Sequence, residues 1–157
     1  MKIIEIPATE AERLVPMLQD LHALHVTHQP ERHIPAPGSG GLAEWLQDWL
    51  SEDNVFALAA ESPQGTLLGY LIYELQERPA LPLRAAETRA MLHHISVTEA
   101  WRRMGVGKAL VEAMKARALK AGATVVAATY APFNTASAAL MQGMGMEPVL
   151  TLAEWRA

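Results

Sequence analysis

The alternation of apolar and polar positions along the chain predicts six strands and four helices. Apolar residues at positions 14, 17, 18 and 21, followed by His25, recur at helical spacing and predict a first helix after Thr9. The other predicted helices cover residues 42–50, 106–122 and 134–144. The predicted strands cover residues 2–6, 55–60, 66–75, 91–97, 124–130 and 149–152.

The segments between these elements carry the residues of helix starts, turns and loops. Thr9 and Glu12 form a capping-box pattern at the first helix, and Pro16 either falls early enough to be tolerated or kinks that helix. Residues 62–65 predict a hairpin turn, and the proline-containing stretches 29–41 and 77–89 predict loops.

The order of these elements defines the fold class. A hairpin followed by a strand, a helix and a strand favours a mixed sheet of the α/β (α+β) class, with helices on both faces. At 157 residues, we expect one domain over residues 1–157.

Composition narrows the class of protein. The chain has no cysteine, so disulfides, thiolate zinc sites and a cysteine nucleophile are excluded. An acidic residue stands among the first apolar positions and no apolar stretch has signal or membrane length, so we expect a cytoplasmic protein without membrane contact.

Charge is unevenly distributed along the chain. Residues 1–80 carry four basic and twelve acidic side chains, whereas residues 81–157 carry nine basic and five acidic ones. This split is either chance or the sign of an anion held by the second half and a cation accepted by the first. A net charge of −4 without a Lys/Arg-rich run argues against nucleic acid as a partner.

The stretch "HHISVTEAWRRMGVGKALV" carries the strongest candidate site. Gly105 and Gly107 lie at the start of a predicted helix, where backbone N–H groups lack partners and the dipole is positive. Arg102 and Arg103 add positive charge, so the turn is typical of a phosphate site, the alternative being a glycine turn with solvated arginines.

Two common phosphate motifs fail at this turn. A P-loop requires glycine at 102 and Ser or Thr at 109, where Arg102 and Ala109 stand. The dinucleotide fingerprint requires glycine at Leu110, and no acid lies about 20 residues further on.

The pattern Arg102-x-x-Gly105-x-Gly107 after a strand ending in "ISV" resembles the GNAT superfamily of N-acetyltransferases. The segment "APFNTASAALMQGMGM" resembles the final segment of that family, and the order of elements agrees over nearly the whole chain. The resemblance implies a GNAT-like mixed, mostly antiparallel, twisted sheet that is split where acetyl-CoA enters. Pro132 suits such a break because it lacks a ladder donor.

The resemblance also implies which residues bind the cofactor. The backbone near the end of the fourth strand would pair with the pantetheine arm, amides of the turn would hold the pyrophosphate, and an asparagine would bind near the thioester. The implied residues are Ile95, Ser96, Val97, Arg102, Arg103, Met104, Gly105, Val106, Gly107, Lys108 and Asn134.

Acetyl transfer to an amine needs a base for the amine proton and an acid for the leaving thiolate. His93 is the candidate base, and strand alternation predicts that it shares a face with Ile95 and Val97 while His94 points to the other face. The alternative is a packed or merely exposed histidine.

The candidate acid is less well defined. The family commonly has a tyrosine where this chain has Met141, which cannot donate a proton. Ser137 and Tyr130 are the candidate substitutes, and water is a third source of the proton.

Two further groups of side chains have structural and functional interpretations. His22, His25, His28 and His33 either line the acceptor side, end a surface helix or, least favoured, bind a metal; we expect no metal. Trp45 and Trp49 share a helix face, which favours core packing or a dimer surface over substrate stacking.

The sequence therefore predicts an acetyl-CoA-dependent N-acetyltransferase that acts on a small-molecule or peptide amine by direct attack on the thioester. The alternative, motivated by Met141, is a non-catalytic acyl-CoA-binding or regulatory module. A homodimer is left open.

Overall fold

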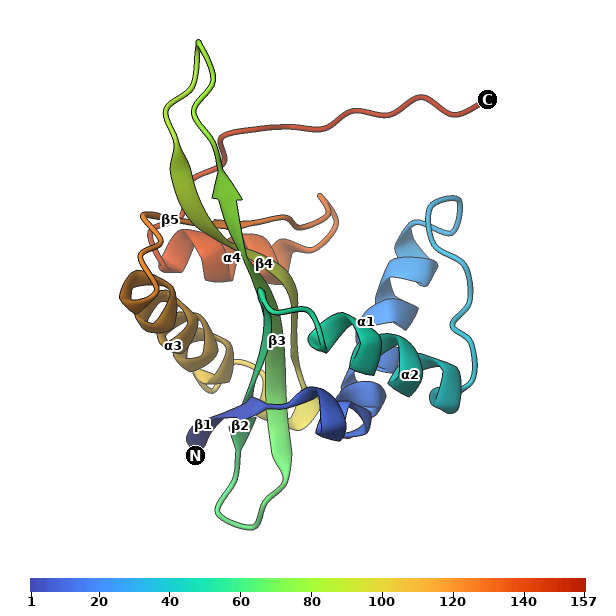
Figure 1. Ribbon diagram of the computed structural model, residues 1–157. Coiled ribbons are helices and arrows are strands. Elements are labelled where there is room, and N and C mark those ends of the chain that lie inside the picture. Colours follow the sequence, from blue (N-terminus) through green and yellow to red (C-terminus); the bar gives the residue numbers. More distant parts are fainter.

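The protein is a five-stranded sheet with helices on both faces, as the computed structural model of residues 1–157 describes it (Figure 1). The strands lie in the order β1-β2-β3-β4-β5; the first four are antiparallel, and β5 runs parallel to β4. This arrangement confirms the predicted mixed, mostly antiparallel sheet. The elements are β1 (Lys2–Ile6), the 3-10 helix η1 (Ala8–Leu14), α1 (Val15–His28), α2 (Ser39–Leu50), β2 (Val55–Glu61), β3 (Leu67–Arg78), β4 (Glu87–Val97), the 3-10 helix η2 (Glu99–Trp101), α3 (Val106–Lys120), β5 (Val125–Ala128) and α4 (Thr135–Gly143).

The central strands are apolar on both sides, so the sheet supports two separate cores. Along β3, Tyr70 and Ile72 enter one cluster of 14 buried residues, while Leu71 and Tyr73 enter a second cluster of 14 on the opposite face. Strand side chains alternate between faces, so an uninterrupted apolar run must be covered twice.

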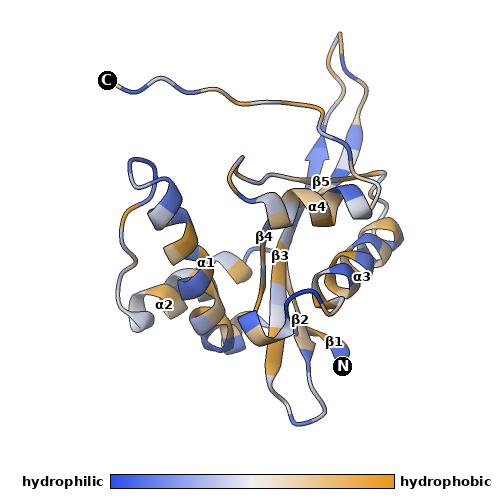
Figure 2. Ribbon diagram, turned by 180° about the vertical axis from the view of Figure 1, so that it is seen from behind, coloured by the Kyte–Doolittle hydropathy of each residue, from blue (hydrophilic) through white to orange (hydrophobic).

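Each core is closed by its own pair of helices. The first cluster includes buried residues of η1, α1 and α2, and the second includes buried residues of α3 and α4. Figure 2 shows the hydrophobic middle of the sheet between these two layers. None of the helices combines the length and the apolar character that a membrane span requires.

The start of the first helical region differs from the prediction. Thr9 is not an N-cap: η1 begins at Ala8 after Pro7, without a side-chain cap bond, and the α-helix starts only at Val15. Pro16 explains this boundary, because it has no N–H to donate to a preceding turn and is tolerated only at the first positions of an α-helix.

The hairpin of β3 and β4 is longer than predicted. β3 continues to Arg78 and β4 starts at Glu87, so the loop shortens to residues 79–86. Arg78 of β3 forms an ion pair with Glu87 of β4, which Arg89 of the same strand also contacts. The Arg78–Glu87 pair stabilises strand pairing that the apolar pattern did not reveal.

The predicted strand at residues 149–152 is wrong. Residues 144–157 follow α4 without forming a helix or a strand. Val149 is 95% exposed and Leu150 is 88% exposed, so an apolar pattern that suits a strand has no sheet beside it here.

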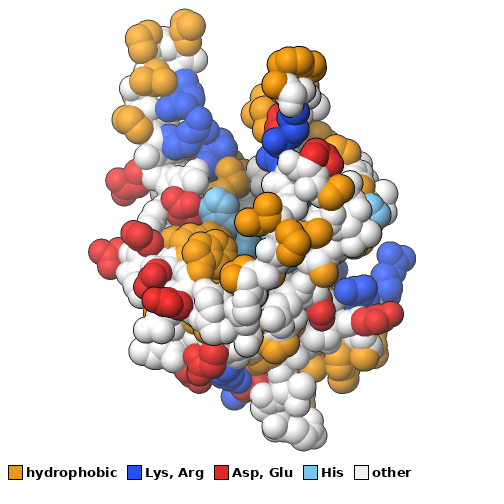
Figure 3. All heavy atoms as spheres, turned by 90° about the vertical axis from the view of Figure 1, so that its right-hand side faces the viewer, with side chains coloured by type: hydrophobic (Ala, Val, Ile, Leu, Met, Phe, Trp, Pro, Cys, Tyr) orange, Lys and Arg blue, Asp and Glu red, His pale blue; other side chains and the backbone are white.

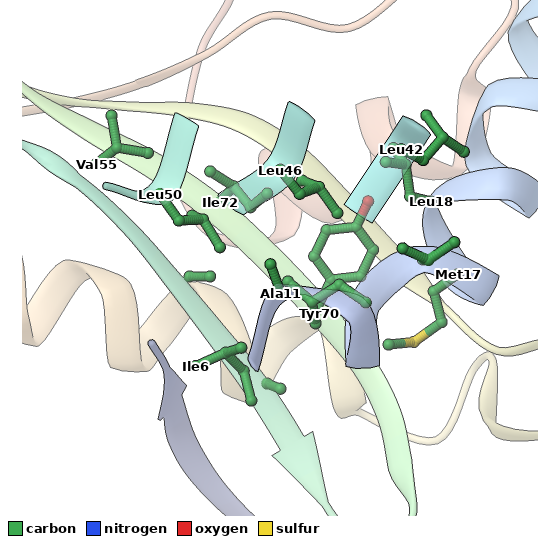
Figure 4. Packing of buried hydrophobic residues seen from close by; sticks show 14 residues of the cluster. Ile6, Ala11, Met17, Leu18, Leu42, Leu46, Leu50, Val55, Tyr70 and Ile72 are labelled. Carbon is green, nitrogen blue, oxygen red and sulfur yellow. The ribbon is translucent and has the colours of Figure 1, made fainter. Parts of the chain in front are cut away.

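Tyr70 provides a test of the first core. Its side chain is 0% exposed and lies among Leu18, Leu42 and Leu46, and its hydroxyl has no hydrogen-bond partner (Figure 4). Tyr70→Phe should raise the free energy of unfolding by about 1 kcal/mol, because it removes an unpaired buried hydroxyl. Urea unfolding would measure this, with Tyr73→Phe, whose hydroxyl is not among the buried unpaired groups, as the control; a loss of stability in Tyr70→Phe would contradict the assignment.

Candidate functional site

β4 extends beyond β5, and this difference opens one side of the sheet. The parallel pairing joins residues 89–92 of β4 to residues 125–128 of β5 and then stops. Residues 93–97 of β4 have β3 on one side and no strand on the other. The backbone of Ile95, Ser96 and Val97 is therefore at a free edge, where an extended ligand can add hydrogen bonds.

The turn before α3 contains two left-handed residues. Arg103 has φ +64°, the only positive φ outside glycine, and Gly105 has φ +84° and caps α3. Such conformations turn successive N–H groups toward one point, which creates an anion-binding concavity. The side chain of Arg102 donates from Nε to the carbonyl of Val97 at 3.0 Å, so it ties this turn to the end of β4.

Six consecutive amides around this turn have no partner in the protein. The first hydrogen bond of α3 runs from Ala109 N–H to the Gly105 carbonyl at 3.0 Å, and residues 103–108 donate no backbone hydrogen bond. The structure thus brings the predicted phosphate-binding residues together beside the free edge of β4. Unpaired amides at the positive end of a helix dipole are suited to a diphosphate.

Two glycines allow β3, β4, α3 and α4 to lie close together. A Cβ at Gly69 of β3 would lie 2.9 Å from the Ser96 carbonyl oxygen and 3.1 Å from Val106 Cγ1. A Cβ at Gly107 would lie 3.2 Å from Leu140 Cδ2 of α4. The missing side chain of Gly107 therefore permits close contact between α3 and α4.

Asn134 is the N-cap of α4. Its Oδ1 accepts from the N–H of Ser137 at 3.0 Å, while its Nδ2 has no partner and remains free to donate. The preceding Phe133 stacks on His28 at 4.3 Å between ring centroids and contacts His25 at 5.4 Å. Phe133 was missed in the sequence, and it joins the loop that carries Asn134 to α1.

His93 occupies a β-bulge. Ile72 pairs with His94 and Tyr73 pairs with Leu92, so His93 is the extra residue of β4. Nε2 of His93 lies 2.8 Å from a carboxylate oxygen of Glu74. Because a carboxylate can only accept, Nε2 donates, and in the neutral form of the ring Nδ1 carries the lone pair. Glu74 was missed in the sequence, although a lone carboxylate in the apolar run "LLGYLIYEL" is a visible signal.

The bulge overturns the predicted facing of His93, whereas His94 points away from Ile95 and Val97 as predicted. Trp49 of α2 contacts His93 at 5.6 Å and His94 at 5.2 Å, so both rings lie on the α2 side of the sheet. Ile95 and Val97 instead pack on the second core. An extra residue resets the alternation of side chains along a strand, which explains the error.

His94 is the most strongly perturbed histidine. Burial, followed by the nearby His93, His25 and His22, lowers the pKa of His94 to about 4 from 6.5. Its Nδ1 is buried without a partner, and its ring lies against Trp49 and 6.3 Å from Trp45. Trp45 and Trp49 therefore pack beside the β4 histidines. Trp49 also packs on the first core.

Three more histidines lie close together at the end of α1 and in the loop after it. The His33 ring is 5.1 Å from His25 and 6.0 Å from His22, and burial, followed by these two neighbours, lowers the pKa of His33. Figure 3 shows histidine side chains in a hollow below two projecting segments, beside Lys and Arg side chains. No group of three His, Cys, Asp or Glu side chains is arranged to hold a metal ion.

The candidate acids are less clearly placed. Met141 is 2% exposed and belongs to the second core, so this side chain packs inward between α3 and α4. Tyr130 follows β5 and packs on the same core, and Ser137 lies in the first turn of α4. No hydrogen bond joins either hydroxyl to His93.

Known proteins resemble this chain at the level of family and fold. A model of the Acetyltransferase (GNAT) family matches residues 18–146, most of the chain, and the chain therefore belongs to that family. No curated protein matches its sequence.

Solved structures cover the chain almost completely at low identity. A tetramutant of the BH1408 protein from Bacillus halodurans has a TM-score of 0.91 at 16% identity, with 100% of both chains covered. The aminoglycoside N-acetyltransferase AAC(6')-Iy in complex with CoA has a TM-score of 0.78 at 19% identity, covering 99% of this chain and 93% of that one. A ribosomal-protein-alanine N-acetyltransferase from Brucella melitensis biovar Abortus 2308 has a TM-score of 0.74 at 16% identity, with 100% of both chains covered. These likenesses confirm the predicted GNAT-like fold.

The lowered pKa of His94 predicts a pH dependence of stability. The folded protein binds this proton more weakly than the unfolded chain, so the contribution of His94 to the unfolding free energy is fully present above about pH 6.5 and is lost as the pH drops toward 4. When the pH is lowered from 7.5 to 5, the unfolding free energy of His94→Leu should fall by about 2 kcal/mol less than that of the parent protein.

Urea unfolding at both pH values measures this difference. Gln19→Ala is the control, since Gln19 is exposed on α1 and carries no titratable group, and it should keep the parent pH dependence. Equal pH dependence in His94→Leu and the parent would contradict the neutral, buried state of His94.

Proposed function

We propose that the chain is an acetyl-CoA-dependent N-acetyltransferase whose single domain spans residues 1–157. The observation that carries this proposal is the run of unpaired amides at 103–108 beside the free edge of β4. A diphosphate with an extended arm is the ligand chemistry that fits both features at once.

CoA has this shape and charge. The amides of residues 103–108 would hold its pyrophosphate, with Arg103 and Lys108 adding positive charge at the exposed rim. The edge of Ile95, Ser96 and Val97 would pair with the pantetheine arm, and the free Nδ2 of Asn134 would donate near the thioester. The similarity to AAC(6')-Iy, solved with CoA, supports the assignment.

The proposed chemistry is direct transfer. Acetyl-CoA supplies an acetyl group activated as a thioester. His93 takes the proton of the acceptor amine at Nδ1, directly or through one water, while Glu74 holds the ring through Nε2. Tyr130, Ser137 or water donates the proton that the leaving sulfur requires.

The acceptor is proposed to be a small-molecule or peptide amine. Glu74 offers a carboxylate to a cationic group, and Trp45, Trp49 and Phe133 offer aromatic faces close to the histidines. The neighbours named as aminoglycoside and ribosomal-protein-alanine N-acetyltransferases act on amines of both kinds. A non-catalytic acyl-CoA-binding module is the second candidate, favoured by the inward packing of Met141.

Gly105 tests the cofactor assignment. Gly105→Val should weaken CoA binding about a hundredfold, since a side chain at φ +84° forces the turn to rearrange and costs about two charged hydrogen bonds. Isothermal titration with CoA measures this. The matched control is Gly65→Val in the β2–β3 turn, where φ is +83° and the space is equally open, so CoA affinity should not change. Equal affinity in both variants would contradict the phosphate site.

His93 tests the catalytic assignment. His93→Gln should lower kcat about a hundredfold and leave CoA affinity unchanged, because glutamine cannot take up the proton. Glu74→Gln should lower kcat by a smaller factor, since it removes only the orienting carboxylate. Turnover is measured with acetyl-CoA and a panel of aminoglycosides, polyamines and peptides, and Glu52→Gln, at an exposed position after α2, serves as the control.

Two outcomes would decide against this role. Full activity of His93→Gln would exclude His93 as the base. Tight CoA binding by the parent protein without turnover on any amine would favour the non-catalytic module.

A further inference from the structure

The outer part of the β3–β4 hairpin has one polar face, and this face leads to His93. Figure 1 shows the hairpin projecting past the helices of both layers. Alternate residues of a strand share a face, and Ala90 and Leu92 enter the second core, so their neighbours on β4 point to the α2 side, where His93 also lies. Three cross-strand pairs share this face: Glu74–Met91, Gln76–Arg89 and Arg78–Glu87.

Two guanidinium groups on this face share one carboxylate oxygen. Arg78 Nη1 donates to Oε1 of Glu87 at 3.1 Å, and Arg89 Nε donates to the same oxygen at 2.8 Å. The hydrogen bond from Arg89 is the main reason why the pKa of Glu87 is lowered, so Glu87 is ionised at neutral pH. Nη2 of Arg78 and Nη1 of Arg89 have no partner in the protein. Two positive charges therefore face one negative charge, with donors to spare for a second carboxylate.

These guanidinium groups are held in place but remain accessible. The side chain of Arg89 is 20% exposed and that of Arg78 is 33% exposed. An arginine that is already fixed by a carboxylate loses little further freedom when it binds a ligand. Arg84 adds a third positive charge, with Nη2 on the Pro79 carbonyl at 3.4 Å and a buried Nε that has no partner. Figure 3 shows Lys and Arg side chains along the taller projection, above the histidines.

The inner end of the same face carries a negative charge. Oε2 of Glu74 lies 2.8 Å from Nε2 of His93, and Oε1 accepts from Nδ2 of Asn54 at 3.2 Å. The face therefore has a carboxylate at its inner end and an excess of positive charge at its outer end. A molecule with an amine at one end and an anion at the other matches both ends.

The distance between the two ends sets the size of such a molecule. Arg89 and His93 are four positions apart on β4, which corresponds to about 12 Å along a strand that contains a bulge. An extended tripeptide spans about 10 Å from its amine to its terminal carboxylate. Arginine binds carboxylates in fork-like pairs, so the length and the end groups of a short peptide both fit.

We propose that the acceptor carries a carboxylate, which Arg78 and Arg89 bind while its amine lies at His93. This inference rests on the proposed acetyl transfer and narrows its acceptor to short peptides and similar amines with an anionic end. The diphosphate of CoA would lie at residues 103–108, beyond the opposite end of β4. The two substrates would therefore approach His93 from opposite directions.

Matched peptides give the first test. The parent protein should acetylate trialanine with a KM about tenfold lower than that of trialanine amide, since only the free acid can bind the arginines. The two kcat values should be similar, because the carboxylate lies far from the reacting nitrogen. Ala-Ala-Asp amide, with a side-chain carboxylate at the same end, distinguishes a side chain from a chain terminus as the source of the anion. Isothermal titration of the CoA-loaded protein measures the same preference without turnover.

Variants of the hairpin give the second test. Arg89→Gln should raise the KM for trialanine about tenfold and leave that for the amide unchanged. Glu87→Gln should lower the KM for trialanine, because it frees both guanidinium groups for the ligand. A purely structural role of the Arg78–Glu87 pair would give the opposite sign. Arg117→Gln is the matched control, since Arg117 also pairs with a carboxylate, that of Glu5, but lies on α3 behind the sheet.

The outcomes separate this proposal from the proposed function. Acetylation of trialanine and its amide with equal KM would overturn the carboxylate site and leave acetyl transfer intact. Trialanine binding that depends on Arg89, without acetylation of any amine, would support the site and contradict the catalytic assignment. A higher KM for trialanine in Glu87→Gln, or no detectable binding of either carboxylate peptide, would also overturn the proposal.

Discussion

The unequal lengths of β4 and β5 are the constraint on which the site depends. Parallel pairing ends at Leu92, and the last five residues of β4 continue with β3 alone beside them. Gly69 allows the Ser96 carbonyl and Val106 to approach β3 closely, so the free edge and the start of α3 are held side by side. The free backbone edge of β4 and the row of unpaired amides before α3 thus lie at one place. Backbone groups alone can supply the contacts to a ligand there.

The histidines extend this arrangement to the other face of the sheet. The bulge at His93 brings two adjacent rings of β4 to the α2 side, against Trp49. There they meet the histidines of α1, and Phe133 links α1 to the loop before Asn134. Elements from both halves of the chain therefore surround the histidines.

Local signals in the sequence predicted the parts of the site that depend on local structure. The start of α3 at Val106 follows from a glycine that can adopt a positive φ, and the asparagine cap at 134 precedes an apolar helical run. The apolar runs of β2 and β3 likewise predicted a sheet that is covered on both faces. The positive φ of Arg103 could not be predicted, since arginine has no preference for it.

Contacts between distant residues account for what the sequence did not reveal. The bulge at His93 depends on its register with β3, and Glu74 became visible as a partner only once the two strands were paired. The contact of Gly107 with Leu140 was likewise not visible, because Leu140 lies 33 positions further along the chain. The pattern at 149–152 predicted a strand, but these residues lie beside no strand of the sheet and form none themselves.

The short ladder of β5 has a consequence for local stability. Four residue pairs attach β5 to β4, compared with ten between β3 and β4. The region from β5 to α4 should therefore open more often than the rest of the sheet, and its amides should exchange with solvent first. A molecule that bridges β4 and α4 would close this opening, so occupancy of the site and order in the last third of the chain are thermodynamically linked.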